Sequence, residues 1–304
     1  MKLFIIGNGF DSAHKYETKY SHYRKYLQEN EDENNCLGDF SLTKIFEDAT
    51  DEDWNSFEEL LGKYNFEEWA SFYTESINQG ETESIQEKKE NWNKYQCENF
   101  YEINQKLSET LKKTLCTFIS IQTSDKKKTK DVVTKNIKPM DLFITFNYSL
   151  LLENLYDINP KRILHIHNSI RDEKQIIFGH GITNLQVDSK FDDYDFNTPE
   201  TMLKNVRARL KKDYQTQRLL TFVKNKNVST IIIMGHSLGQ IDQVYFQKLH
   251  NLYSMAKIIF YFYYDKNLKD SHGRPITKEK QRDNYKKQLQ NLFGLKSDIK
   301  IKEW

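Results

Sequence analysis

The first residues able to do chemistry are Gly7-Asn8-Gly9-Phe10-Asp11, which follow a short apolar segment. A buried strand, a Gly-x-Gly turn and a helix are the parts from which α/β proteins build a nucleotide pocket. Glycine lets the backbone approach a ligand, and a helix N-terminus offers free N–H groups to phosphate. We therefore expect a nucleotide site at this turn. Because the first strand begins at the start of the sequence, we expect no signal or transit peptide before it.

Three further polar segments follow apolar ones: Thr145-Phe146-Asn147-Tyr148-Ser149, then His165-Ile166-His167-Asn168-Ser169, and then Gly235-His236-Ser237-Leu238-Gly239. In an open α/β sheet, the loops at the carboxyl ends of the strands form the ligand crevice. The sequence therefore predicts that the four polar loops converge on one pocket.

The last of these loops also matches G-x-S-x-G, the nucleophile elbow of α/β-hydrolases, with Ser237 as the nucleophile. Asp265 or Asp270 would then precede His272 in the required order. A hydrolase sheet needs several strands after the elbow, but we expect only one clear strand and a lysine-rich helix there. The other interpretation is a tight strand-to-helix turn whose N–H groups and hydroxyl face a phosphate or ribose.

Two histidines, His165 and His167, are separated by one residue on a predicted strand, so their side chains should face opposite sides. Only one can easily face the crevice, and we expect it to be His167. A His-x-His pair can also bind a metal, but no third ligand lies at a telling spacing, and we expect no metal. Asn147 either contacts the ligand or pins a turn.

The elements that must position these loops are short segments rich in β-branched residues or Phe, as in buried parallel strands. They predict an α/β fold with a Rossmann-like parallel sheet flanked by helices. The expected strands are Lys2–Ile6, Asp141–Thr145, Ser229–Met234 and Lys257–Tyr264, with weaker candidates at Arg162–Ile166 and Gln175–Gly179.

Two stretches, about 20–123 and 188–223, read as helical insertions into a single domain spanning 1–304. The first carries apolar stripes at helical spacing, which we interpret as helix-packing core. The second begins near Thr198-Pro199-Glu200, a typical helix start. The stripes are Phe57, Leu60, Leu61 and Tyr64, and then Phe100, Ile103, Leu107 and Leu111.

The composition argues against several classes of protein. The 304 residues include 45 basic and 44 acidic side chains, a formal net charge of +1, so overall charge favours neither nucleic acid nor an anionic membrane. No apolar run approaches the roughly 18 residues of a membrane span. Cys36, Cys97 and Cys116 are odd in number and far apart. This favours reduced thiols in a cytoplasmic protein.

The motifs resemble a known family, the phage abortive-infection proteins called AbiH. The resemblance is carried by Gly7-Asn8-Gly9-Phe10-Asp11 and by the downstream Gly235-His236-Ser237-Leu238, which are specific as a pair. Between and around them, further matching positions occur in the same order. These are His14, Thr18, Tyr20, Thr145-Phe146-Asn147-Tyr148, His165-Ile166-His167, Asp242 and Tyr245-Phe246.

That family is in turn more distantly similar to sirtuin-like NAD-binding domains. The resemblance gives Gly7 and Gly9 the place of the first glycine loop, Asn147 that of the Asn in T-x-N, and His167 that of the catalytic histidine. Gly235 and Ser237 match the late loop that holds the adenine-side ribose. Asn168 stands where the pattern has Gly, and Asn tolerates a left-handed backbone better than most residues. Cys-x-x-Cys pairs are absent, so the zinc module and protein deacetylation are not expected.

The resemblance implies NAD as substrate and cleavage of its nicotinamide–ribose bond. Asn147 and His167 are then the expected catalytic residues. Backbone N–H groups around Gly9 and Phe10 would hold the pyrophosphate, and Asp11 would bond a ribose hydroxyl or cap its helix. His14 would line the nicotinamide end or be a core histidine, and Asp242 would support the late loop. The other expected contacts are Gly7, Asn8, Tyr148, His180, Gly235, His236, Ser237 and Leu238.

Three functions stay open at this point. One is an NAD-degrading effector of phage defence, another a nucleotide-binding sensor without turnover, and the third a serine hydrolase. The expected partners are NAD or a related nucleotide and a phage-derived trigger or co-encoded defence protein. The aromatic-rich insertions are candidate interfaces for a homo-oligomer.

Overall fold

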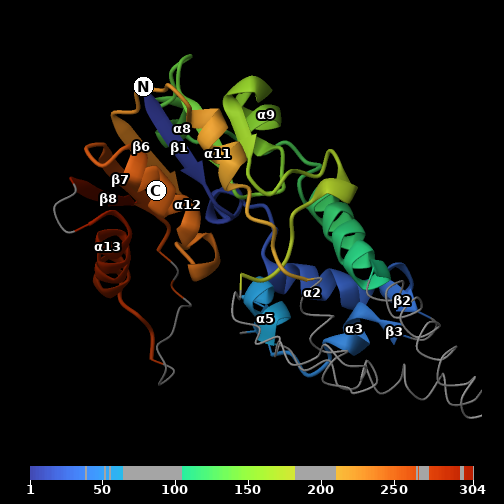
Figure 1. Cartoon of the computed structure of the whole chain (residues 1–304). Coiled ribbons are helices and arrows are strands. Elements are labelled where there is room, and N and C mark those ends of the chain that lie inside the picture. Colours follow the sequence, from blue (N-terminus) through green and yellow to red (C-terminus); the bar gives the residue numbers. More distant parts are fainter. Residues whose placement is uncertain are drawn as a thin grey trace, which may run out of the picture. The chain divides into compact units, whose positions relative to one another are not determined.

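A computed structural model gives the fold of the chain (Figure 1). The structure describes residues 1–37, 40–50, 53–54, 56–63, 105–181, 210–264, 266, 274–294 and 298–303. Their contacts group them into two compact units. The first comprises Met1–Lys19, Ile119–Ile176 and Tyr214–Trp304, and the second comprises Tyr20–Phe118 and Ile177–Asp213.

The first unit is built on a parallel sheet, in which the described residues form six strands. Its spatial order is β5-β4-β1-β6-β7-β8. In chain order this is 3-2-1-4-5-6, the arrangement of doubly wound dinucleotide-binding sheets. The predicted Rossmann-like α/β fold is thus confirmed. The strands are β1 (Lys2–Ile6), β4 (Leu142–Thr145), β5 (Ile163–His165), β6 (Thr230–Met234), β7 (Lys257–Phe262) and β8 (Ile299–Glu303).

Helices cover both faces of this sheet, which explains why its central strands are apolar at nearly every position. Along β1, Leu3 and Ile5 join one buried cluster, while Phe4 and Ile6 join another. The first cluster includes residues of α11 (Thr216–Val223), α12 (Gln243–Leu252) and α13 (Lys278–Phe293). The second includes residues of α1 (Gly9–Ala13), α8 (Asp131–Thr134) and α9 (Leu151–Tyr156).

One strand prediction is wrong, and one strand was missed. Gln175–Gly179 is not a strand: a 3-10 turn, η3 (Glu173–Gln175), ends there, and only His180 forms an isolated bridge, to Lys211. The alternating apolar residues Ile176 and Phe178 are buried without pairing in a sheet. Conversely, β8 was not predicted, because its Ile-Lys alternation belongs to an edge strand with one solvated face.

The second unit holds most of the expected insertions and a core of its own. Phe57, Leu61, Leu107 and Leu111 are fully buried, as the helical stripes predicted; Tyr64, Phe100 and Ile103 lie outside the described residues. Its elements are α2 (Tyr20–Glu29), η1 (Glu31–Asn34), β2 (Asn35–Leu37), β3 (Phe40–Ser41), α3 (Leu42–Ile45), α5 (Phe57–Lys63) and part of a helix at 105–122.

The second insertion is shorter than predicted at its C-terminal end. Helix α11 was assigned to it, but Leu219 and Val223 of this helix pack in the core of the sheet. The expected helix start at Thr198 lies outside the described residues. Among the residues that the structure describes, no helix combines the length and apolar character that a bilayer crossing requires.

Candidate functional site

The two glycine loops meet where the strand order reverses, between β1 and β6. In doubly wound sheets this switch point opens the ligand crevice at the carboxyl ends of the strands. Here the loops bond to each other: the Gly9 N–H donates to the Gly235 carbonyl at 2.7 Å, and the Gly7 N–H donates to the Met234 carbonyl at 3.0 Å. The sequence correctly predicted two loops at one edge, and the structure adds that they are in direct backbone contact.

This contact explains the glycines. A Cβ on Gly9 would lie 2.8 Å from the Gly235 Cα, and a Cβ on Gly235 would lie 2.1 Å from the Phe10 nitrogen. Gly235 also has a left-handed backbone, with φ of 69°. The Phe10 N–H donates to the Gly7 carbonyl at 2.8 Å. The Gly9 and Phe10 N–H groups, which we expected near a pyrophosphate, are thus both donated within the protein.

The Asn147 amide joins the β4 loop to the β1 loop. Its Nδ2 donates to Asp11 Oδ1 at 2.7 Å and to the Gly7 carbonyl at 3.1 Å. Since an amide nitrogen carries two hydrogens, both are used, and Oδ1 is the atom with which Asn147 can engage a ligand. Asn147 therefore fixes the turn through Nδ2, and its Oδ1 is the atom that can accept a hydrogen bond from a ligand.

The Asp11 carboxyl is almost fully buried beneath this amide. Asp11 lies within α1 and does not precede it, and its observed side-chain partner is Asn147. Burial raises the pKa of Asp11 from 3.8 to about 6, and polar neighbours, among them the Asn147 amide that donates to it, oppose that rise. A carboxyl group so placed takes up a proton just below neutral pH.

Asn8 and His14 stabilise the segment around α1. The Asn8 Nδ2 donates to the Thr18 carbonyl at 3.0 Å, and the Thr18 hydroxyl donates to Asn8 Oδ1 at 2.6 Å. His14 contacts the Phe10 carbonyl through Nδ1 at 2.7 Å and the Tyr156 hydroxyl through Nε2. Burial lowers the pKa of His14. His14 is therefore the core histidine of the two alternatives, with both ring nitrogens engaged inside the fold.

The two histidines of the β5 loop have different surroundings. β5 ends at His165, so the two residues do not alternate along one strand as predicted. His165 Nε2 lies 3.0 Å from Glu153 Oε1, which Arg171 also approaches at 3.4 Å. Burial raises the pKa of Glu153, but the hydrogen bond and charge of His165, with the charge of Arg171, bring it below its usual value. His165 thus contacts the carboxylate that Arg171 also approaches, whereas His167 faces Asp242.

Asn168 turns the chain after His167. Its φ of 59° is left-handed, as the replacement of Gly by Asn in the family pattern led us to expect. The Asn168 Nδ2 donates to the Gln175 carbonyl, and its Oδ1 accepts from Arg218 Nη1 at 2.7 Å. Arg218 Nη2 also contacts the His165 carbonyl at 3.4 Å. An exposed arginine of α11 thereby fixes the turn that carries His167.

His167, Asp242 and His236 form the cluster of titratable groups at this edge of the sheet. His167 Nε2 lies 3.5 Å from Asp242 Oδ1, and His236 Nε2 lies 3.5 Å from Asp242 Oδ2. Both imidazole rings pack edge-on against Phe146, with centroids 5.4 and 4.5 Å from it. Tyr148 also lies near His167, with ring centroids 6.2 Å apart. One carboxylate thus faces two imidazoles in an aromatic setting.

The geometry of Ser237 differs from a nucleophile elbow. The left-handed residues of its loop are Gly235 and Leu238, not the serine, and a 3-10 turn, η4 (Gln240–Asp242), separates it from α12. Ser237 is exposed, whereas Leu238 is buried in the core. The remaining triad candidates, Asp265, Asp270 and His272, lie outside the described residues.

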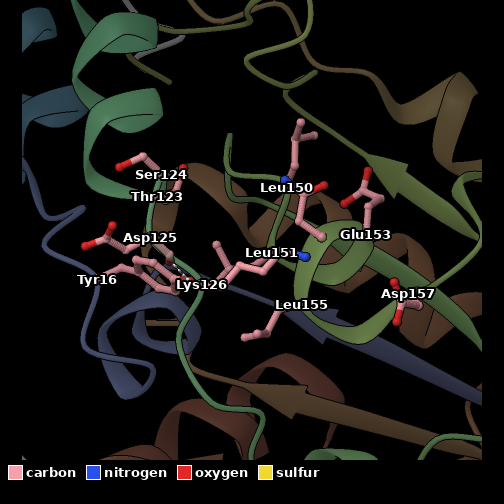
Figure 2. Close-up of a pocket in the computed structure, with 11 residues that line it drawn as sticks. Tyr16, Thr123, Ser124, Asp125, Lys126, Leu150, Leu151, Glu153, Leu155 and Asp157 are labelled. Carbon is pink, nitrogen blue, oxygen red and sulfur yellow. Dashed lines mark hydrogen bonds between the residues drawn. The ribbon is translucent and has the colours of Figure 1, made fainter.

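A cavity of about 300 Å³ lies between α9 and the segment 123–126 (Figure 2). Figure 2 shows Tyr16 and Asp125 on one wall and Leu150, Leu151 and Leu155 on the other. The Tyr16 hydroxyl donates to the Asp125 carbonyl at 2.8 Å. None of the three residues of the His–Asp–His cluster lines this cavity. The full lining is Tyr16, Thr123, Ser124, Asp125, Lys126, Leu150, Leu151, Glu153, Asn154, Leu155 and Asp157.

Comparison with known proteins decides the family. Residues 3–264 match the family model described as "Bacteriophage abortive infection AbiH". The chain belongs to the AbiH family. A role in phage abortive infection follows from that membership. No curated protein and no solved structure matches the chain.

One residue expected in the site of this AbiH protein, His180, belongs to the second unit. It is fully buried, and its backbone pairs with Leu210 and Lys212. An ion pair nearby in the chain could not be predicted from the sequence: Lys212 Nζ lies 2.7 Å from Glu58 Oε2, and the Lys212 side chain has no exposed surface. The Tyr20 hydroxyl donates to Glu58 Oε1 at 2.9 Å. Isolated Lys and Glu residues carry no such signal in a sequence.

Over the described ranges, no group of three or more His, Cys, Asp and Glu side chains is placed to hold a metal ion. Cys116 is a buried free thiol.

Proposed function

We propose that this AbiH-family protein hydrolyses NAD at the nicotinamide–ribose bond and so depletes the infected cell of NAD. The observation that carries the proposal is the His167–Asp242–His236 cluster at the carboxyl edge of a 3-2-1-4-5-6 sheet. Such a sheet binds nucleotides at this edge. The Asn147 loop follows β4, which lies between β1 and β5 in the sheet.

The proposed reaction needs few groups. Cleavage passes through an oxocarbenium-like state, and the nicotinamide leaves as a neutral molecule because its ring nitrogen takes the electrons of the broken bond. Water adds to the ribose and loses a proton. His167 accepts that proton, as histidine does near neutral pH. Asn147 Oδ1 accepts a hydrogen bond from the water or a ribose hydroxyl.

The pyrophosphate requires a site other than the first glycine loop, whose N–H groups are donated internally. Arg218 supports such a site, because it is exposed and contacts the turn that carries His167. A guanidinium has five N–H donors, so three remain beyond the two described contacts. We assign the phosphate contact to Arg218.

The test is incubation of the purified protein with NAD, with nicotinamide and ADP-ribose followed by chromatography. The expected result is release of both by the wild type and by Ser237→Ala, and loss of release in His167→Ala. Equal release by His167→Ala would overturn the assignment of the base. Loss of release in Ser237→Ala, with labelling of Ser237 by a fluorophosphonate, would favour the hydrolase instead.

A sensor without turnover uses the same loops, and the internal bonds of Asn8, His14 and Asn147 suit a rigid binding pocket equally. The two functions separate in the same experiment. Thermal stabilisation by NAD with no product over hours, in the presence of phage lysate as a source of the trigger, would favour the sensor.

A further inference from the structure

The surroundings of the His167–Asp242–His236 cluster indicate which of its ring nitrogens carry protons. The Leu238 N–H donates to His236 Nδ1 at 2.9 Å inside the core. A backbone N–H can only donate, so Nδ1 carries a lone pair and the neutral ring carries its proton on Nε2. That Nε2 is the atom facing Asp242 Oδ2. His236 is thus locked as a donor toward Asp242.

The orientation of Asp242 is a second, independent observation. Asp242 is the N-cap residue of α12, where aspartate ordinarily accepts hydrogen bonds from the first N–H groups of the helix. Here its side chain makes no cap hydrogen bond. Its two oxygens instead face His167 Nε2 and His236 Nε2. The carboxylate is directed at the imidazoles in place of its local capping role.

We propose that Asp242 is a positioning residue that accepts from Nε2–H of both imidazoles and thereby makes Nδ1 the basic nitrogen of His167. An ionised carboxylate only accepts, so the His167 nitrogen facing it carries the proton. Both contacts are 3.5 Å long in the structure, and we expect them to shorten when substrate fills the site, as catalytic hydrogen bonds commonly do. A metal bridging the rings is disfavoured, because the locked Nε2–H of His236 has no lone pair to donate.

The kinetic part of this inference rests on the proposed NAD hydrolysis. In that reaction the O–H proton of water moves to His167 Nδ1 while the water oxygen bonds to the ribose carbon. The electrons of the C–N bond pass to the nicotinamide nitrogen. Asp242 stabilises the imidazolium so formed, which then releases its proton to solvent. His236 holds Asp242 in place and does not touch the substrate.

The test is long-range ¹H–¹⁵N NMR of the ¹⁵N-histidine-labelled full chain at pH 7.5, which reports the tautomer of each ring without turnover. Signals are assigned by their loss in His167→Gln and His236→Gln. The expected result is the Nε2–H form for both rings. The Nδ1–H form as the major species of either ring would overturn the proposal, whether or not NAD is hydrolysed.

The variant Asp242→Asn sharpens the test. Because the Leu238 N–H keeps His236 a donor, the new amide turns its oxygen to His236 and its NH₂ to His167. His167 should then change to the Nδ1–H form while His236 does not; an unchanged His167 would contradict the role of Asp242. Where turnover is measurable, kcat should fall roughly 10²–10⁴-fold. Asp283→Asn, on an exposed face of α13, is the matched control. If Asp242→Asn does not fold, the wild-type spectrum still decides.

Discussion

The Asn147 amide donates to the buried Asp11 carboxyl at 2.7 Å, which joins the ends of β4 and β1 through side chains. The same amide donates to the Gly7 carbonyl at 3.1 Å. A single side chain therefore fixes two loops of the nucleotide edge and fixes its own orientation. Its remaining acceptor, Oδ1, is the basis of its proposed role toward ribose or water.

The buried Asp11 should make stability depend on pH. Its pKa is raised from 3.8 in the unfolded chain to about 6 in the native state. Between those pH values the native state binds the proton more tightly than the unfolded chain does. The contribution of Asp11 to the free energy of unfolding is therefore greatest below pH 4 and falls as pH rises toward 6. Above pH 6 the ionised group costs the native state on the order of 3 kcal/mol.

Asp11→Asn removes this cost, because the amide oxygen can still accept from Asn147. The free energy of unfolding of the variant, relative to the wild type, should rise by about 3 kcal/mol between pH 4 and pH 7. Urea unfolding across that range measures the difference. A difference that stays flat with pH would show that Asp11 is not the group responsible.

The contact between the glycine loops predicts a strong effect of a single methyl group. Gly235→Ala adds a Cβ 2.1 Å from the Phe10 nitrogen at a left-handed position, and should destabilise the fold by about 3 kcal/mol or more. Gly239→Ala, in the same loop, meets nothing closer than 3.5 Å and has no left-handed φ. Thermal unfolding should leave this control within about 0.5 kcal/mol of the wild type, and equal effects of the two changes would refute the packing role.

Arg218→Gln should weaken NAD binding, because it removes the cation assigned to the phosphates. We expect KM for NAD to rise about tenfold, with kcat affected less. Nicotinamide riboside carries no phosphate, so the same variant should treat it like the wild type does. A similar loss on both substrates would instead mean that Arg218 acts by holding the Asn168 turn.

The Lys212–Glu58 ion pair predicts strong coupling in the second unit. Lys212 is fully buried, so Lys212→Met removes the cation that lies 2.7 Å from Glu58 and should cost about 3–5 kcal/mol. The added change Glu58→Gln removes the carboxylate charge that faced Lys212, and the amide oxygen can still accept from Tyr20. In denaturant unfolding, the double variant should therefore regain about 2 kcal/mol. Strict additivity of the two changes would contradict a coupled pair.

The central strands were predictable because both faces of each are buried, so β1, β4 and β6 read as unbroken apolar runs. The strand predictions failed where buried residues do not pair with a neighbouring strand, and where a paired strand carries exposed polar residues. Ile176 and Phe178 alternate without a neighbouring strand, and β8 pairs with β7 despite its lysines. The local sequence pattern indicates which residues are buried, whereas strand pairing depends on residues far away in the chain.

The site shows the same limit. The four loops and their common edge followed from motifs after strands, and His167 was chosen over His165. The sequence could not predict that the Gly9 and Phe10 N–H groups are donated within the protein, because Gly235 approaches from a distant part of the chain. The contact of Asp242 with His236 could not be predicted either. In a sequence, an aspartate that caps a helix cannot be told from one that faces an imidazole, and the Leu238 N–H that orients His236 is seen only in the structure.

The most direct test is a time course of total NAD in phage-infected cells that carry either the wild-type chain or His167→Ala at equal protein levels. We predict that NAD falls before lysis only with the wild type, with nicotinamide and ADP-ribose rising in step, and that protection against the phage is lost with the variant. Protection with unchanged NAD, or equal NAD loss with His167→Ala, would contradict NAD cleavage at this site.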